Sequence, residues 1–390
     1  MKTKLIMAAI AVCLASCGQR GTQAPTDNDG TAAADSAAAT ITVKYATGFT
    51  VRDSAGIRLL EVGGHNDSPK ADGGSHKGGH GKTYRFALVR DASADVPEGY
   101  QRVKVPIERT LCMTALQLSN FTALDALDFV RGITSTKNLF NKEVHQRVGD
   151  GRMVKIGMEG EFDPELIMAA NPDVIFISPS KRGGYDAIAE TGITLVPHLG
   201  YKELDPLGQA EWVKFVGMFI NKEREANKLF EGIENRYNEL KAKAAETTGR
   251  PTVMSGEMHY GMWHAVGGRN YLAQIFRDAG ADYVIDDEET SGENLEFERM
   301  YAISANADYW RILNSYPGQF SYEALKASEP RNELFQAFRN RKVIYCNMRQ
   351  TPYYESSPVE PDVMLKDLVA IFHPELVETG YKPKYYRLLE

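Results

Sequence analysis

Three features are missing from this sequence of 390 residues, and each absence excludes a class of protein. Basic residues are not in excess, because 45 Lys and Arg stand against 52 Asp and Glu for a net charge of −7. A nucleic acid is therefore not an expected partner. The composition is not extreme, since 43% hydrophobic and 25% charged residues exclude global disorder, collagen and a multi-span membrane protein. Neither Gly-x-Ser-x-Gly nor His-Glu-x-x-His occurs, which argues against most enzymes.

A Gly- and His-rich insertion over residues 63–81 contains the one stretch that superficially resembles a nucleotide site. It ends Gly-His-Gly-Lys-Thr, but His76 stands where a phosphate-binding loop needs glycine, and no apolar strand precedes it. His65, His76 and His80 lack the cysteine or carboxylate cluster that would define a metal geometry. We interpret the insertion as a surface loop and expect no catalytic residue, no metal site and no intrinsic cofactor. The alternative is an exported hydrolase or a metal carrier that uses these histidines.

The amino terminus resembles the export signal of bacterial lipoproteins. Lys2 and Lys4 precede an apolar run over residues 5–15 that is too short for a permanent membrane helix, and the run ends Leu-Ala-Ser-Cys at Cys17. The resemblance implies a signal peptide over 1–16 and lipidation of Cys17, which would anchor the chain to a membrane. A plain secretory signal with a chance cysteine is the alternative. The predicted location is the cell envelope, facing the periplasm.

Residues 17–40 follow as a segment rich in Ala, Gly, Thr and Asp, which we interpret as a flexible tether. Of the four cysteines, Cys13 leaves with the signal and Cys17 is consumed by the lipid. Cys112 and Cys346 remain, beside strand-like runs in different halves of the chain. We therefore expect two separate buried thiols and no bridge.

The length exceeds that of one compact core and suits two lobes of about 150 residues each. Residues 41–105 alternate apolar and polar side chains over 41–45, 57–60 and 84–89, which predicts an antiparallel β-ribbon. From residue 106 the rhythm becomes βα, which predicts a parallel sheet covered on both faces. In a first lobe, 106–221, strands are expected at 110–113, 173–177 and 193–196, and helices at 116–129, 162–170 and 185–190. In a second lobe, 248–390, strands are expected at 252–256, 282–285, 307–313 and 342–346, and helices at 272–279 and 298–305.

Residues 222–247 are predicted to form one stiff helix between the lobes. Asn221 is the one obvious interruption within 211–245, and no proline occurs there. Apolar residues recur at a spacing of three to four and make one stripe. At about 1.5 Å per residue the helix would span roughly 35 Å, the width of a lobe.

This plan, together with several short segments, resembles the substrate-binding lipoproteins of ABC importers for iron-siderophores, haem and cobalamin. The resemblance covers about residues 109–390 and rests on Phe-Asp-Pro-Glu-Leu at 162–166, Asn-Pro-Asp-Val-Ile at 171–175, Ala-Glu-Trp-Val-Lys-Phe at 210–215, Tyr-Leu-Ala-Gln at 271–274, Asp-Ala-Gly-Ala-Asp-Tyr at 278–283 and Phe-His-Pro-Glu at 372–375. It implies an α/β fold of two Rossmann-like lobes joined by one long helix, as in class III periplasmic binding proteins. The β-ribbon would be an extension outside the common core. It also implies a monomer that captures an iron complex, haem or cobalamin between its lobes and delivers it to a permease with its ATPase.

Glu165 and Glu298 stand at equivalent places in the two halves, each in the first turn of a helix that leads to a strand. Their positions match where the family places the carboxylates that dock on permease arginines, so the resemblance implies a docking role. The alternative is that acids are simply favourable at helix N-termini.

Ligand contacts are expected at the carboxyl ends of strands, where ligands bind in open α/β sheets. Aromatic and basic residues gather in those segments and suit a macrocycle or its charged groups. Either histidine or Tyr260 of the segment 258–264 could ligate haem iron, and Trp263 is expected to contact the ligand because glycine bounds its loop. The candidate set is Met113, Lys181, Arg182, Tyr185, His259, Tyr260, Trp263, His264, Tyr316, Arg349, Tyr353 and Tyr354.

Overall fold

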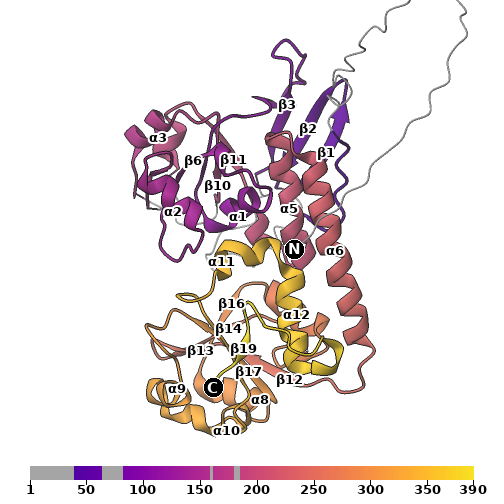
Figure 1. Ribbon diagram of the computed structural model, residues 1–390, viewed down its shortest axis with the longest axis vertical. Coiled ribbons are helices and arrows are strands. Elements are labelled where there is room, and N and C mark those ends of the chain that lie inside the picture. Colours follow the sequence, from indigo (N-terminus) through magenta and orange to yellow (C-terminus); the bar gives the residue numbers. More distant parts are fainter. Residues whose placement is uncertain (1–38, 64–81, 159–160, 180–184) are drawn as a thin grey trace, which may run out of the picture. The chain divides into compact units, whose positions relative to one another are not determined.

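The computed structural model describes residues 39–63, 82–158, 161–179 and 185–390 (Figure 1). Ala39–Glu390 form one compact unit. The predicted signal peptide, Cys17, most of the tether and the insertion with His65, His76 and His80 lie outside the described residues. Within the described ranges, no helix is both long and apolar enough to cross a membrane.

The amino-terminal extension is a four-stranded sheet in the order β1-β2-β3-β4. The first three strands pair antiparallel as predicted, whereas β3 and β4 are parallel, because the chain crosses over through residues 90–100 before it returns to the sheet. Residues of that crossover cover one face of the sheet around Ile57, Leu59 and Ala87. The strands are β1 (Phe49–Ser54), β2 (Ile57–Val62), β3 (Tyr84–Val89) and β4 (Gln101–Lys104).

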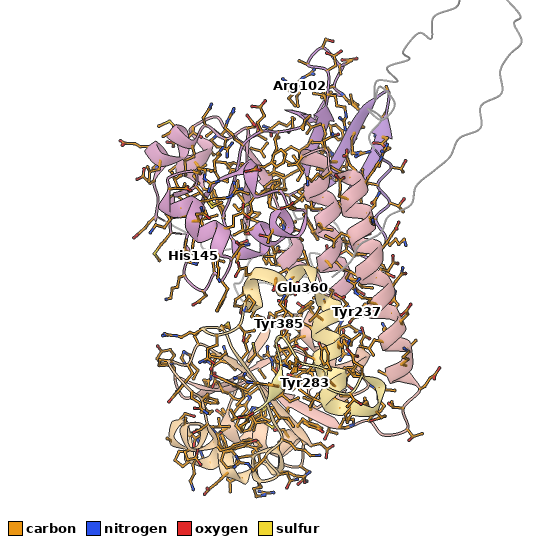
Figure 2. The ribbon with its side chains drawn as sticks, in the orientation of Figure 1. Arg102, His145, Tyr237, Tyr283, Glu360 and Tyr385 are labelled. Atoms are coloured by element: carbon orange, nitrogen blue, oxygen red, sulfur yellow. The ribbon has the colours of Figure 1, made fainter. Side chains whose placement is uncertain are left out.

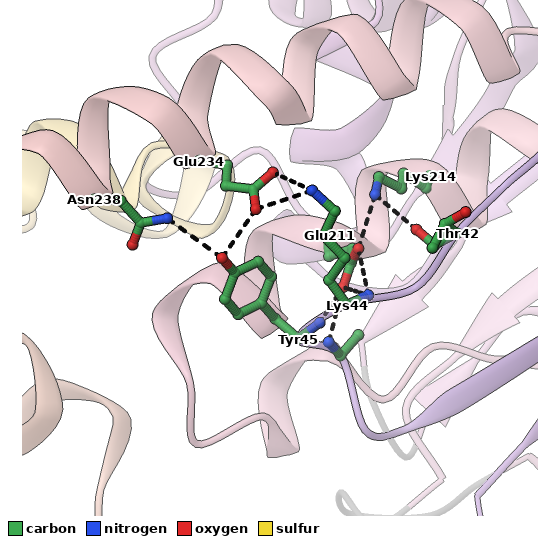
Figure 3. A network of polar contacts seen from close by, with 8 residues as sticks. Thr42, Lys44, Tyr45, Glu211, Lys214, Glu234 and Asn238 are labelled. Carbon is green, nitrogen blue, oxygen red and sulfur yellow. Dashed lines mark hydrogen bonds and ion pairs between the residues drawn. The ribbon is translucent and has the colours of Figure 1, made fainter.

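The strand predicted at residues 41–45 does not form. Glu211, fully buried in α5 (Pro206–Phe219), accepts hydrogen bonds from the backbone N–H groups of Lys44, Tyr45 and Ala46 at 2.9, 2.7 and 2.9 Å (Figure 3). Glu203 binds the next two N–H groups, those of residues 47 and 48. Side-chain carboxylates thus take the place of a neighbouring strand for residues 42–48, which we call the N-terminal strap.

The first lobe holds a wholly parallel sheet in the order β11-β10-β5-β6-β7. The helix predicted at 116–129 ends at Ala123, because Asp125 adopts a left-handed φ of +50°, and β6 then follows unpredicted. The strands are β5 (Thr110–Cys112), β6 (Val130–Ile133), β7 (Val154–Lys155), β10 (Val174–Ile177) and β11 (Thr194–Pro197), with a short pair β8 (Gly157–Met158) and β9 (Glu161–Phe162). The helices are α1 (Ala115–Ala123), α2 (Lys142–Gly149), α3 (Pro164–Ala170) and α4 (Asp186–Ala189).

The second lobe repeats the plan with the sheet order β15-β12-β17-β18-β19, of which only the edge strand β19 runs antiparallel. A smaller antiparallel sheet, β13-β14-β16, follows β12. The strands are β12 (Thr252–Ser255), β13 (Glu257–His259), β14 (Met262–Val266), β15 (Asp282–Tyr283), β16 (Gly292–Leu295), β17 (Tyr309–Asn314), β18 (Val343–Asn347) and β19 (Arg387–Leu388). The helices are α7 (Tyr271–Asp278), α8 (Phe297–Ser304), α9 (Tyr322–Ser328), α10 (Gln336–Arg339), α11 (Tyr353–Ser356) and α12 (Pro361–Phe372).

Two consecutive helices join the lobes. Asn221, at a φ of +58°, separates α5 from the predicted long helix, which is α6 (Glu223–Ala245). The apolar stripe of α6 is buried at Phe230, Ile233 and Tyr237, and α6 packs against α5 and α12 (Figure 1). The Tyr237 hydroxyl donates a 2.8 Å hydrogen bond to Asp278 of α7, which ties α6 to the second lobe.

The carboxyl terminus is held by a buried carboxylate in the same way as the strap. Asp367 of α12 accepts hydrogen bonds from the backbone N–H groups of Lys384, Tyr385 and Tyr386 at 3.1, 2.6 and 3.1 Å. The Tyr385 hydroxyl also donates to Glu360, which lies beside it (Figure 2). These contacts keep the tail against the second lobe.

The two remaining cysteines are free, as predicted. Cys112 and Cys346 are both buried and unpaired. Burial raises the pKa of each thiol, that of Cys346 to about 11. Both are therefore protonated, unreactive core residues at neutral pH.

His198, at the end of β11, is fully buried against the Trp212 ring at a centroid distance of 4.5 Å. Its Nε2 lies 3.3 Å from the Asn120 amide nitrogen. Burial lowers the pKa of the imidazole from 6.5 to about 3, so the ring is neutral in the folded state.

We expect acid to destabilise the fold through His198. Between pH 6 and about pH 3, His198 is protonated in the unfolded chain but stays neutral in the folded protein. As the pH is lowered through this range, the free energy of unfolding should fall by about 1.4 kcal/mol per pH unit because of this group. Urea unfolding at several pH values measures how the free energy of unfolding depends on pH. In His198→Gln this dependence should be weaker than in wild type by that amount per pH unit. Equal slopes in the two proteins would contradict the assignment.

Candidate ligand-binding site

The carboxyl ends of β12, β17 and β18 bring a polar cluster together in the second lobe. The Asn314 amide nitrogen lies 3.3 Å from a carboxylate oxygen of Glu257, and the Tyr345 hydroxyl donates a 2.9 Å hydrogen bond to Oδ1 of the Asn314 side chain. Glu257 is half-buried, and burial raises its pKa above the usual range. Ligands bind at this edge in open α/β sheets, so the cluster marks the candidate site.

The hairpin β13–β14 carries three predicted ring residues beside this cluster. Tyr260 and Gly261 form its turn with φ of +49° and +82°, a conformation typical of a tight two-residue hairpin. Tyr260 is 93% exposed, and its ring lies 4.2 Å from that of His259. His264 lies 5.7 Å from His259, measured between ring centroids. The structure therefore gathers His259, Tyr260 and His264 on one exposed surface.

Glu257 and the two histidines share a face of the hairpin. Glu257 pairs with His264 across the strands, and His259 lies two residues further along β13. In an antiparallel pair such residues point to the same side. Sequence patterns singled out the rings of this segment but not Glu257 or Asn314, each of which is a polar residue directly after a predicted strand.

Trp263 is not a loop residue, contrary to expectation. It is the second residue of β14, is fully buried, and packs against Trp310 and Phe335 at 5.4 and 5.3 Å. Its indole N–H donates to the Ser255 carbonyl at 3.0 Å. Strand alternation turns Trp263 to the opposite face from His264, so it belongs to the core and not to the ligand surface.

Tyr353 is also a core residue, whereas its neighbour Tyr354 is 56% exposed. The Tyr353 hydroxyl lies 3.2 Å from that of Tyr386 and 3.5 Å from the guanidinium of Arg311, a buried cation of β17. Neighbouring side chains of a helical turn point in different directions, so Tyr353 is buried in the core while Tyr354 reaches solvent. The prediction that both contact ligand is therefore wrong for Tyr353.

The helix α11 also contacts the first lobe. Glu355, buried, accepts hydrogen bonds from the backbone N–H groups of Phe140 and Asn141, the latter at 2.8 Å. Tyr354 thus lies on an element that both lobes hold in place. Two second-lobe candidates remain. Tyr316 follows β17 and is half-buried, and Arg349 follows β18 and is exposed.

In the first lobe, the predicted contacts are less accessible. Met113 is 4% exposed, and its backbone N–H donates to the Gln117 side chain at 2.6 Å. Tyr185 stacks on Phe162 at 5.5 Å, and its hydroxyl accepts from the Ser178 backbone N–H. Met113 is therefore a core residue and not a surface contact. Lys181 and Arg182 lie outside the described residues.

The two candidate docking glutamates are exposed in the first turns of α3 and α8, each helix leading to a strand as predicted. They differ in their surroundings. Glu298 makes a 3.0 Å ion pair with Arg331, whose guanidinium also binds Glu329 and lies over the Phe297 ring. No ion pair of Glu165 with a described residue is found.

A cavity of about 690 Å³ opens at the other end of the second lobe. Residues before β12, β17 and β18 line it, among them Arg250, Asp308 and Lys342. This is the amino edge of the sheet, opposite the edge where α/β sheets bind ligands. In the described part of the chain, no group of three or more His, Cys, Asp or Glu could hold a bare metal ion.

Comparisons with known proteins agree with this architecture. A family model described as periplasmic binding protein matches residues 114–349. An uncharacterized lipoprotein of Methanocaldococcus jannaschii is 27% identical over 311 residues, 76% of this chain and 72% of that protein.

A periplasmic haem-binding protein of Pseudomonas aeruginosa has a TM-score of 0.57 at 16% identity, covering 71% of this chain and 95% of the other. The vitamin B12-binding protein BtuF of Vibrio cholerae has a TM-score of 0.52 at 11% identity, covering 70% and 99%. The structural likenesses show a shared fold.

Proposed function

This chain belongs to the periplasmic binding protein family, and we propose that it is the lipid-anchored substrate-binding component of an ABC importer. Its cargo is a chelated metal: an iron-siderophore complex, haem or cobalamin. It binds the cargo between its two lobes as a monomer and delivers it to a membrane permease driven by an ATPase. It performs no chemistry on the cargo.

The observation that carries this proposal is the exposed ring surface at the carboxyl edge of the second lobe. His259, Tyr260 and His264 lie together there without burying their rings in the core. Flat rings complement a macrocycle or an aromatic chelate, because removing apolar surface from water contributes about 25 cal/mol per Å². Tyr354, on the element held by both lobes, adds a fourth exposed ring.

The histidine and tyrosine side chains of this surface favour a metal that is already bound in a chelate. Iron held in a porphyrin needs one or two further ligands, which His259, His264 or Tyr260 can each supply. A bare ion needs a set of three or more protein ligands, and the described residues bring no such group of His, Cys, Asp and Glu together.

Membrane attachment and docking complete the proposal. Cys17 would carry the lipid, in keeping with the lipoprotein relative. Glu165 and Glu298 would contact basic residues of the permease, one from each lobe, and their exposure leaves both carboxylates accessible to a partner.

Titration of the purified protein with haemin, cyanocobalamin and a ferric siderophore tests the proposal. We expect one of these chelates to raise the melting temperature and to bind with a dissociation constant in the micromolar range or below. A free ferric salt serves as the control and should cause no saturable shift. Binding of free metal with no response to any chelate would contradict the proposed cargo.

A further inference from the structure

Three buried carboxylates of the described chain have several donors each, although Asp362, also buried, has one oxygen without a partner. Glu211 accepts from three backbone N–H groups and from the Lys214 ammonium, which lies 2.8 Å away. Asp367 accepts from three backbone N–H groups and the Tyr381 hydroxyl. Glu355 accepts from two backbone N–H groups. This is the usual state of a carboxylate removed from water.

Glu257 has fewer donors than these three carboxylates. Among the described residues its carboxylate has one donor, the Asn314 amide at 3.3 Å, and it has no ion pair with a Lys or Arg. The side chain is half-buried, so the carboxylate has lost part of its hydration, and this burial raises its pKa. Its remaining lone pairs are open to a donor from outside the chain.

The local backbone places this carboxylate at the site. Gly256, with φ of +97°, turns the chain from β12 into β13, and a Cβ there would lie 1.9 Å from the His264 carbonyl oxygen. Glu257 therefore emerges at the carboxyl edge, on the hairpin face that carries His259 and His264. The Tyr345 hydroxyl donates to Asn314 and so orients its amide nitrogen toward Glu257.

We propose that Glu257, positioned by Asn314, is the residue that recognises hydrogen-bond donors on the rim of the cargo, and that it selects an amide-rich corrinoid over polyanionic chelates. This inference rests on the proposed function and narrows its cargo class. A corrin ring carries primary amides whose N–H groups complete the bonding of the carboxylate. The propionates of haem and the charge of a ferric catecholate would instead meet a like charge in a partly dehydrated site, where repulsion is strong.

The test compares the wild-type protein with Glu257→Gln, using cyanocobalamin and haemin as probes in equilibrium titrations. The amide replacement keeps the size of the side chain but removes its charge. We expect wild type to prefer cyanocobalamin, and the substitution to weaken cyanocobalamin binding about tenfold or more. Haemin binding should stay unchanged or become tighter. Glu333→Gln, an exposed carboxylate paired with Lys326 in the same lobe, is the matched control and should change neither affinity.

Thermal unfolding of Glu257→Gln checks that the variant folds, and no loss of stability is expected, since a partly dehydrated charge is removed. Tight haemin or ferric siderophore binding without cyanocobalamin binding would overturn this inference while leaving the proposed function intact. Unchanged cyanocobalamin affinity in the variant would overturn it as well. Failure of every chelate to bind would contradict the proposed function itself.

Discussion

Replacing Glu211 with alanine is expected to lower the free energy of unfolding by about 3–5 kcal/mol. Three backbone N–H groups of the N-terminal strap would lose their acceptor, and the ammonium of Lys214, 5% exposed, would remain without its carboxylate (Figure 3). Urea unfolding followed by tryptophan fluorescence, to which the adjacent Trp212 of α5 contributes, measures the change. An unpaired buried charge is the dominant cause of the expected loss.

Lys44 provides a control from the same network. Its ammonium pairs with Glu234 at 2.9 Å but is 49% exposed, so Lys44→Ala should cost less than about 1 kcal/mol. Adding Lys214→Met to Glu211→Ala should recover part of the stability, because the double variant no longer contains the unpaired, buried ammonium of Lys214. If Glu211→Ala and Lys44→Ala were equally stable, the strap would not be held in the way described.

Reversing the charge of both Glu165 and Glu298 to lysine is expected to abolish cargo uptake by cells that contain the cognate permease. Like charges would then face each other across the interface, while the ligand surface stays unaltered. Uptake of labelled cargo measures the first effect, and titration of the purified variant measures the second. Of the single variants, Glu165→Lys should be the more damaging, because Arg331 already partly neutralises Glu298.

A second pair of exposed glutamates, one per lobe, gives the matched control. Glu190→Lys with Glu323→Lys adds the same positive charge on residues outside α3 and α8 and should leave uptake near the wild-type level. Full uptake by the Glu165/Glu298 double variant would remove the docking assignment. Loss of uptake in both double variants would indicate a general charge effect instead.

Sequence patterns predicted the helices and strands whose buried residues follow a regular spacing within the element itself. The apolar stripe of α6 and the buried runs of β10 and β18 are readable because each buries a face or strand along its own length. The starts of α3 and α8 are likewise indicated by the residues next to them. The family segments between residues 162 and 375 then fixed how these elements join into two lobes.

The errors arose where a distant partner decides the conformation. The alternation at 41–45 suits a strand, but Glu211 of α5 binds its backbone. Trp263 is expected in a loop because glycine bounds its segment, whereas Tyr260 and Gly261 form a tight hairpin turn and Trp263 lies in β14. The burial of Tyr353 depends on Arg311 of β17 and on Tyr386 of the carboxyl-terminal tail, both distant from it in the sequence.

If this protein carries a chelated metal, as we propose, the absorbance spectrum and metal content of the protein purified from its native host will show it. We expect a chromophore that copurifies in a ratio approaching one per chain: a corrin spectrum with cobalt if Glu257 selects a corrinoid, or an iron chelate if only the broader proposed function holds. A colourless, metal-free protein whose melting temperature responds to none of the three chelates would contradict the proposed function.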